Sequence, residues 1–279
     1  MPHREQALRP PDPLPIAVAD NHCHLDISRD DDPPTPPDQA LDAAAEVGVD
    51  RVVQIGCDLA SAAWTVDAIE RHARMLGGVA IHPNGAPALH HAGELDDACA
   101  RIEEYAARPR VRVVGETGLD YYRTGPEGVQ SQQESFRRHI EIAKRTGLAL
   151  QIHDRDAHED VLRILAEEGA PERTVLHCFS GDMAMARECV RRGYFLSFAG
   201  TITYKNARDL RNALAVVPTE HLLVETDAPY LTPSPHRGRT NGSYLVPLTV
   251  RAMAETLNCA VPTLCQSLST NSEEVYGPW

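Results

Sequence analysis

The sequence lacks a paired-cysteine signature. Its seven cysteines are an odd number, none of them forms a C-x-x-C pair, and most fall within segments that we predict to be strands or helices. This pattern excludes a zinc ribbon and argues against a disulfide framework. We therefore expect reduced thiols in a cytoplasmic protein.

The start of the chain has no apolar run. Residues 1–15 are rich in proline and charge, which excludes a signal peptide and a membrane span for this segment. We predict that residues 1–15 form a flexible arm, that residues 16–279 form one domain, and that the protein does not associate with membranes.

An excess of basic residues is also missing. The 27 Lys and Arg are outnumbered by 40 Asp and Glu, which gives a formal net charge of -13. This charge argues against a general nucleic-acid coat, because affinity for phosphate backbones normally comes from clustered Lys and Arg. A local phosphate site stays compatible with it, because charges beyond a Debye length of about 8 Å are largely screened. The acidic surface favours a monomer.

What the chain does contain is a regular alternation of short apolar runs and longer amphipathic segments. With 279 residues and 42% hydrophobic content it can bury a large core. About eight runs alternate with helical segments, and this pattern predicts an α/β protein with a TIM-type (β/α)8 barrel. The predicted strands are residues 16–26, 51–57, 78–82, 111–115, 148–153, 174–177, 194–199 and 222–227.

Helix signals lie between these runs. Apolar spacing predicts a helix over residues 39–47 that ends at Gly48, after an exposed loop at residues 30–38. Ser131-Gln132-Gln133-Glu134 has the form of a capping box at the start of another helix, and Gly147 is suited to its C-terminal cap. Residues 245–279 predict one or two closing helices.

Polar side chains gather at the predicted strand ends. His22 and His24 alternate along the first strand and therefore leave the same face. In a parallel barrel the C-terminal strand ends meet at one mouth, where catalytic groups stand. The candidate metal ligands at these ends are His22, His24, Glu116, His153, His177 and Asp227.

Six ligands are more than one tetrahedral ion can use. We therefore predict two divalent ions about 3.5–4 Å apart, bridged by one carboxylate and a water. Imidazole and carboxylate ligands suit Zn, Mn, Fe, Ni or Co, and Mg less well. The predicted assignment is His22, His24 and Asp227 for the first ion, His153 and His177 for the second, and Glu116 as the bridge.

Further candidates surround these ligands. Glu225 shares a strand face with Asp227 and is predicted either to hold a ligand imidazole or to form a structural salt bridge. Arg155 shares the side of the chain on which His153 lies, and its alternative is an ion pair with a nearby aspartate. The predicted substrate contacts are His82, Tyr121, Arg155, Lys205, Arg237 and Arg239, with Tyr121 and Tyr122 either stacking a base or packing internally.

Together these stretches resemble those of the TatD-type metal-dependent deoxyribonucleases of the amidohydrolase superfamily. The matching residues are 20–26, 115–121, 152–157, 177–181 and 225–231. The resemblance implies a TIM-like barrel, two divalent ions and hydrolysis of DNA phosphodiesters, often from the 3′ end. We expect a water activated by the ions to attack phosphorus, Asp227 to accept its proton, and Glu116 to share in catalysis as the bridge.

Two motifs depart from the family pattern. His82-Pro83-Asn84 stands where relatives commonly have His-Pro-His, and Asn241-Gly242-Ser243 stands where relatives often have Asn-Glu-Pro. These changes bear on substrate preference and leave the six ligands intact. One alternative is a hydrolase of a small carboxylic ester, lactone or amide. A non-catalytic binding scaffold is a second alternative, which predicts an incomplete ligand set.

Overall fold

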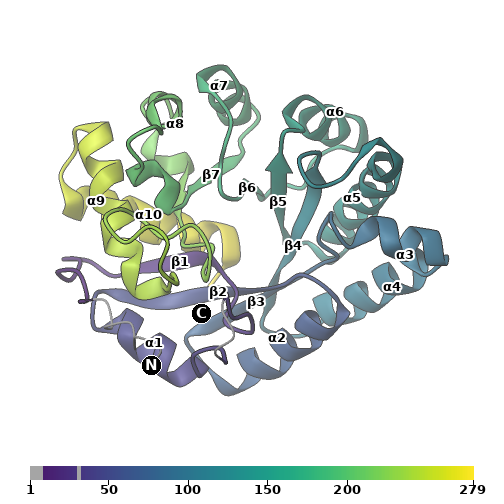
Figure 1. Cartoon of the computed structure of the whole chain (residues 1–279), viewed down its shortest axis with the longest axis horizontal. Helices are drawn as coiled ribbons and strands as arrows, with labels where there is room; N and C mark the ends of the chain where they lie inside the picture. The colour runs from purple at the N-terminus through teal and green to yellow at the C-terminus, as the bar shows by residue number, and fades with distance from the viewer. Residues whose placement is uncertain (1–8, 30–32) are drawn as a thin grey trace, which may run out of the picture.

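Eight parallel strands lie in sequence order in a single sheet, and helices alternate with them around the outside (Figure 1). The computed structural model describes residues 9–29 and 33–279. The strands are β1 (Val18–Cys23), β2 (Val49–Gly56), β3 (Met75–Val79), β4 (Val111–Asp120), β5 (Ala149–Arg155), β6 (Thr174–Leu176), β7 (Phe195–Phe198) and β8 (Leu222–Val224). This arrangement confirms the predicted single domain with a (β/α)8 barrel.

The barrel closes through the chain that follows its last strand. Within the described residues no regular ladder joins β1 to β8. Instead Asp227 N–H donates to the carbonyl of His22 (2.9 Å), His24 N–H donates to the carbonyl of Ala228 (2.8 Å), and Cys23 forms an isolated bridge with Ala228. Residues beyond β8 therefore complete the ring beside β1.

Two strands run past their predicted ends. The sequence predicts ends at residues 115 and 153, whereas β4 continues to Asp120 and β5 to Arg155. The two strands stay paired up to the partners Asp120 and Arg155, which holds both extensions in place. Glu116 therefore lies within a strand rather than at its end.

The helices cover the outside of the barrel. They are α1 (Pro37–Ala45), α2 (Leu59–Arg71), α3 (Ala86–Ala92), α4 (Leu95–Ala106), α5 (Pro126–Thr146), α6 (His158–Glu168), α7 (Met183–Arg191), α8 (Arg208–Leu214), α9 (Val246–Leu257) and α10 (Val261–Tyr276), with 3-10 turns η1 (Gly200–Thr203), η2 (Thr219–His221) and η3 (Ser243–Leu245). The predicted closing helices are α9 and α10. No helix in the described parts of the chain has both the length and the apolar character needed to cross a membrane.

Two predicted helix starts are wrong. The helix α5 begins at Pro126 rather than at Ser131, because proline suits the first helical position and needs no N–H partner there. The predicted loop at residues 30–38 overlaps α1, which begins at Pro37, and residues 30–32 lie outside the described residues. The C-terminal cap is as predicted, since Gly147 has a φ of 68°.

The core has an inner and an outer layer. The inner cluster fills the barrel with side chains from alternating strand positions, including Val53, Leu76 and Val113. Tyr276 of α10 is fully buried in this cluster, and its hydroxyl accepts a hydrogen bond from Gln151 Nε2 (2.8 Å). The outer cluster lies between strands and helices. The barrel is thus a filled core whose polar groups collect at one mouth.

The predicted arm is partly attached to the barrel. Leu14 is buried, and its N–H donates to the carbonyl of Val47 (2.9 Å). The Arg251 guanidinium donates to the carbonyls of Asp12 (2.8 Å) and Pro13 (3.1 Å). The expectation of a flexible arm therefore does not extend to residues 12–14, and residues 1–8 lie outside the described residues.

Candidate metal centre

Six predicted ligands from five strands meet at one mouth of the barrel. His22 lies on β1 and His24 directly follows it, Glu116 lies on β4, and His153 lies on β5. His177 follows β6, and Asp227 follows β8 by three residues. Four of these residues have side chains that are at most 5% exposed. The side chains of His153 and Asp227 are 19% and 16% exposed. A substrate would therefore approach from the side of His153 and Asp227.

The first group of donor atoms has the spacing that one ion needs. Ligand atoms about 2.0–2.1 Å from a tetrahedral Zn²⁺ lie about 3.3–3.4 Å apart. His22 Nε2 lies 3.2 Å from His24 Nε2 and 3.6 Å from Glu116 Oε1. His24 Nε2 lies 3.5 Å from that oxygen and 3.4 Å from Asp227 Oδ1. These four side chains could hold one ion.

A second group gathers around the other oxygen of Glu116. Oε2 lies 2.8 Å from His177 Nε2 and 3.0 Å from His153 Nδ1, and these two nitrogens are 3.5 Å apart. Glu116 thus presents one carboxylate oxygen to each group. This is the position that the sequence predicts for a bridging ligand.

Hydrogen bonds behind the rings determine which nitrogens face inward. His22 Nδ1 lies 2.6 Å from Gln151 Oε1, and His24 Nδ1 lies 2.9 Å from the carbonyl of Ile55. Both acceptors need the proton on Nδ1, which leaves each Nε2 with a bare lone pair. Two lone pairs that face each other at 3.2 Å repel unless a cation or a proton lies between them. The donor set therefore fits a metal ion.

His177 is oriented in the same way by a carboxylate. Its Nδ1 lies 3.2 Å from Glu225 Oε1, which also accepts the N–H of Cys178 at 2.7 Å. Glu225 is fully buried, so it takes the position expected of a group that holds a ligand imidazole. His153 directs Nδ1 inward and Nε2 toward Asp120 Oδ2 at 3.3 Å.

The charged groups of the centre shift one another's pKa values. Burial would raise the pKa of Glu116, but the neighbouring His177 and His82 outweigh it and hold that pKa well below its usual range. Burial would likewise lower the pKa of His177, but Glu116 and Glu225 raise it well above the ordinary value. Glu116 and Asp227, whose pKa values are both lowered, thus favour their charged forms. An ion that bound here would displace protons from the imidazoles.

The backbone at Asp227 is left-handed, with a φ of 56°. Asp and Asn tolerate this region better than most residues do. Asp20 fixes the adjoining segment, because its carboxylate accepts hydrogen bonds from the N–H (2.9 Å) and hydroxyl (2.6 Å) of Thr226 and from Ser243 Oγ (2.7 Å). Burial raises the pKa of Asp20 to about 6. This network aims Asp227 at the first group of donors.

A glycine on β4 allows the close approach of β5. Gly118 has a φ of 135°, and a Cβ there would lie 2.1 Å from the carbonyl oxygen of His153. Only glycine combines this backbone conformation with that contact. The Gly-Glu-Thr-Gly stretch therefore positions Glu116 and His153 on adjacent strands.

Three polar groups belong to the centre although the sequence did not place them there as ligands. His82, predicted as a substrate contact, lies with Nε2 3.7 Å from Glu116 Oε2, and burial lowers its pKa to about 4. Asp120 contacts His153 and accepts a hydrogen bond from Asn84 Nδ2 (3.2 Å). The thiol of Cys57 donates to Glu116 Oε1 at 3.4 Å. The order of residues along the chain carries no signal for these approaches.

The predicted substrate contacts separate into two kinds. Arg155 stacks on Tyr122, which is 66% exposed, with 3.9 Å from the guanidinium carbon to the ring centroid. Arg237 stacks on Tyr204 in the same way at 4.0 Å. These two pairs, Arg155–Tyr122 and Arg237–Tyr204, form the Arg–Tyr rim.

The other predicted contacts differ in exposure. The hydroxyl of Tyr121 donates to Asp160 (2.7 Å), and its ring packs against the core, so Tyr121 has a packing role. Lys205 is exposed on the segment after β7. Arg239 is half-buried after β8, and its carbonyl accepts hydrogen bonds from Arg29 and Thr232.

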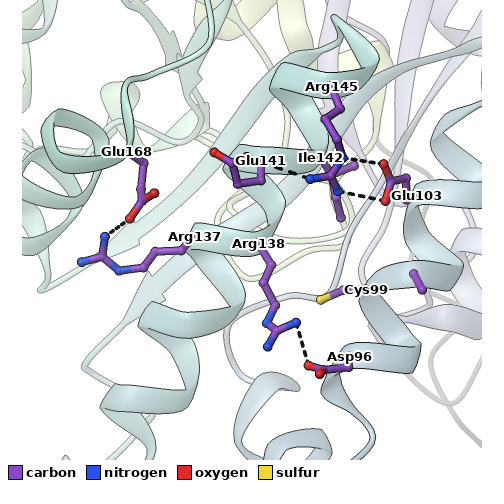
Figure 2. Close-up of a pocket in the computed structure, with 10 residues that line it drawn as sticks. Asp96, Cys99, Glu103, Arg137, Arg138, Glu141, Ile142, Arg145 and Glu168 are labelled. Carbon is purple, nitrogen blue, oxygen red and sulfur yellow. Dashed lines mark hydrogen bonds and ion pairs between the residues drawn. The ribbon is translucent and has the colours of Figure 1, made fainter.

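A cavity of about 430 Å³ on the outer face of α4 and α5 is a separate feature (Figure 2). The three arginines that line it are all paired with carboxylates: Arg145 binds Glu103 (2.8 Å), Arg138 binds Asp96 (2.6 Å), and Arg137 binds Glu168. None of the six candidate ligands lines this cavity. Since its arginines are already paired, the lining offers no unpaired cationic group to an anionic ligand.

Another pocket, of about 320 Å³, adjoins the centre itself. His24 and Gly242 line it together with apolar side chains that include Leu25, Pro229 and Tyr244. Gly242 is the position at which this chain departs from Asn-Glu-Pro. The pocket therefore opens beside the first group of donors.

The barrel and its ligand cluster define a class of protein: metal-dependent hydrolases that carry imidazole and carboxylate ligands at the mouth of a (β/α)8 barrel. Residues 19–277 match the model of the family described as TatD related DNase, and the chain belongs to the TatD family of metal-dependent hydrolases.

Relatives in several bacteria support this membership. A Mycobacterium tuberculosis protein described as "Uncharacterized metal-dependent hydrolase TatD" is 46% identical over 266 residues, which cover 93% of this chain and 98% of that protein. The corresponding protein YcfH of Escherichia coli K12 is 35% identical, with coverage of 93% and 95%.

Solved structures support the fold. The crystal structure of YjjV, a TatD homologue from Escherichia coli, aligns with a TM-score of 0.84 at 24% identity and covers 94% of this chain and 98% of that chain. The phosphotriesterase homology protein of Escherichia coli, complexed with phosphate in its active site, aligns with a TM-score of 0.71 at 13% identity and covers 94% and 99%.

Proposed function

We propose that this chain is a deoxyribonuclease that hydrolyses the phosphodiester bonds of DNA from the 3′ end with two divalent ions. The observation that carries the proposal is the convergence of four imidazoles and two carboxylates at ligand spacing. Glu116 directs one oxygen to each group of donors, which is the arrangement that two-ion hydrolysis requires. The family description agrees with this substrate.

The chain's own residues would divide the work. When bound, two divalent ions would lower the pKa of a water and neutralise phosphate oxygens. Asp227 lies at the more exposed side of the centre and would accept the proton of the attacking water. Glu116 would keep both groups of ligands in register, while Gln151 and Glu225 fix the imidazoles from behind.

The Arg–Tyr rim would bind the nucleic acid. Arginine guanidinium groups bind phosphate oxygens in a bidentate way, and tyrosine rings stack on unpaired bases. Tyr122 is the most exposed of the large apolar side chains among the described residues. The phosphate in the active site of the phosphotriesterase homology protein supports a phosphoryl substrate at the mouth of this fold.

The experiment is hydrolysis of a single-stranded oligonucleotide labelled at either end. We expect Mn²⁺ or Mg²⁺ to support stepwise shortening from the 3′ end, a chelator to stop it, and Asp227→Asn to reduce the rate by about 10³-fold or more. Unchanged nuclease activity in Asp227→Asn would indicate a contaminating enzyme and contradict the proposal.

A second candidate is hydrolysis of a small carboxylic ester, lactone or amide at the same centre. The mostly apolar pocket beside His24 favours it, because such a pocket suits an acyl group. Purified protein that ignores oligonucleotides but cleaves members of an ester and lactone panel, with loss of that activity in Asp227→Asn, would select this candidate.

A further inference from the structure

A thiol lies beside the centre and has no role in the proposed hydrolysis. Cys57 directly follows β2, the strand next to β1, and is half-buried. Its Sγ lies 3.4 Å from Glu116 Oε1 and 3.7 Å from His24 Nδ1. Glu116 Oε1 belongs to the first group of donors, whereas His24 Nδ1 is the ring nitrogen that faces the carbonyl of Ile55 (2.9 Å). Cys57 therefore lies next to a candidate ion site, at the edge of the inner apolar cluster.

The spacing of this thiol is that of a ligand. With bonds of about 2.3 Å to sulfur and about 2.0 Å to oxygen, the two atoms lie about 3.5 Å apart on a tetrahedral ion. The distance from Cys57 Sγ to Glu116 Oε1 is 3.4 Å. The same oxygen lies 3.6 Å from His22 Nε2 and 3.5 Å from His24 Nε2. Three donors thus surround Oε1 at nearly equal distances.

The donor atoms of His24, Cys57 and Glu116 also all lie within 4.8 Å of one another. The thiol donates its hydrogen to Glu116 Oε1. An ion that Oε1 ligates would lie beside the sulfur, and coordination to that ion would release the thiol proton to solvent. The contact that now holds the thiol then becomes a contact between two ligands of one ion.

We propose that Cys57 is a fifth ligand of the first ion, beside His22, His24, Glu116 and Asp227, and that it biases the site toward thiophilic divalent ions such as Zn²⁺, Co²⁺ or Cd²⁺ over Mg²⁺ and Mn²⁺. Thiolate ligands select the softer ions, whereas carboxylates and water suit Mg²⁺ and Mn²⁺. The proposal rests on the metal-binding part of the proposed function and does not depend on DNA as the substrate.

Cys178 provides a matched control. It directly follows the candidate ligand His177 and is also half-buried. Its N–H donates to Glu225 (2.7 Å), but its thiol belongs to none of the His, Cys, Asp and Glu clusters found among the described residues. Two cysteines thus follow strands at the same mouth, and one of them has ligand spacing.

The first experiment is a Co²⁺ titration followed by absorption. We expect the wild-type protein to show a thiolate-to-cobalt charge-transfer band, Cys57→Ser to lose it while still binding Co²⁺, and Cys178→Ser to retain it. We also expect Cys57→Ser to weaken Zn²⁺ binding by roughly tenfold or more, with Mn²⁺ binding little changed. A Co²⁺-loaded wild-type protein without the band, or a band that survives in Cys57→Ser, would overturn the proposal.

The second experiment uses only the wild-type protein and so does not depend on how a variant folds. Cysteines are alkylated in the chelated and in the Zn²⁺-loaded protein, and the labelled peptides are quantified by mass spectrometry. We expect Zn²⁺ to protect Cys57, and to leave the half-buried Cys259 labelled as before. Equal labelling of Cys57 in both states would contradict the proposal. Neither readout involves hydrolysis, so a failure to cleave DNA is a separate result.

Discussion

Three imidazoles of the candidate metal centre have a hydrogen-bond partner behind the ring. Gln151 orients His22, the carbonyl of Ile55 orients His24, and Glu225 orients His177. Such partners fix the tautomer of the ring and raise its basicity as a ligand. Ion affinity should therefore depend on residues outside the ligand set.

Glu225 is the clearest case. Removal of its carboxylate in Glu225→Ala leaves His177 Nδ1 without its partner, and we expect Zn²⁺ affinity to fall by about 10–100-fold. Competition with a chromogenic chelator measures this change. The exposed Glu220→Ala provides the control. Equal Zn²⁺ affinity in Glu225→Ala and the wild type would show that Glu225 only packs.

The Arg–Tyr rim is open to a kinetic test. Tyr122→Ala removes an exposed stacking surface, and a lost base stack costs about 1–3 kcal/mol. We expect KM for single-stranded DNA to rise by about 5–100-fold while kcat stays nearly unchanged. Arg101→Ala is the control, because Arg101 stacks on Tyr105 of α4 in a similar pair. A fall in kcat alone would argue against a binding role for Tyr122.

Residue patterns predicted which six side chains converge at the mouth but missed their neighbours. His22 and His24 were predictable because alternation along a strand places both on one face. Asp120 was missed as part of the centre because the strand was expected to end at Gly115, five residues early. The approach of Cys57 to Glu116 joins β2 to β4, and no local sequence pattern records a contact between strands so far apart in the chain.

The strand β4 contains one position, Gly118, that a larger residue does not fit. Gly118→Ala would place a methyl group 2.1 Å from the carbonyl of His153 at a φ of 135°, and we expect it to lower the free energy of unfolding by about 3 kcal/mol or more. Chemical denaturation measures the change. Gly147→Ala is the control: it also has a positive φ but meets nothing within 4 Å, so a loss of about 1 kcal/mol is expected. Equal losses in the two variants would refute the steric explanation.

The helix α5 docks on the chain after β3 through a neutral histidine. His139 is fully buried, its Nε2 accepts the N–H of Ile81 (3.0 Å), and burial lowers its pKa from 6.5 to about 4. Between these values the unfolded state binds a proton that the folded state does not. Stability should therefore fall as the pH drops from 6.5 to 4, by about 3 kcal/mol from this group.

Urea denaturation at a series of pH values tests this expectation. The variant His139→Gln keeps an acceptor for Ile81 but has no titratable ring, so its stability should vary less over the same pH range. An identical pH dependence in the variant and the wild type would rule out His139 as the cause.

The start of α5 shows why helix boundaries were harder to predict than helices. Ser131-Gln132-Gln133-Glu134 has the form of a cap, yet these residues lie inside the helix and make tertiary contacts. Gln132 accepts the N–H of Asp120 (2.9 Å), and Gln133 donates to the hydroxyl of Tyr121 (2.8 Å). These polar side chains connect α5 to the residues at the end of β4 and just after it. They have the same sequence pattern as a capping box, although they lie inside the helix.

For the whole molecule, the fold followed from the sequence because the strands are buried on both faces over most of their length and are therefore rich in apolar residues. The Arg–Tyr rim could not be predicted in the same way, because the stacking of Arg155 on Tyr122 and of Arg237 on Tyr204 connects segments that are far apart in the sequence. The periodicity of apolar residues predicts the strands and the helices that cover them. It does not predict which side chains from distant segments contact each other in the folded chain.

The ion centre should contribute to the stability of the whole barrel. A ligand that binds only the folded state adds about 2.7 kcal/mol at a free concentration of one hundred times its Kd. We therefore expect chelation to lower Tm by several degrees and added Zn²⁺ to restore it. The variant His22→Ala, which lacks one candidate ligand, should show a much smaller response to Zn²⁺. A Tm that is indifferent to both chelator and Zn²⁺ would contradict ion binding.

The closure of the ring has a mechanical consequence. Seven neighbouring strand pairs share regular ladders, while the junction between β1 and the residues after β8 depends on a few hydrogen bonds. His22 and His24 lie on one side of that junction and Asp227 on the other. An ion bound by all three would crosslink β1 to the segment after β8. Opening of the barrel at this junction would then require release of the ion.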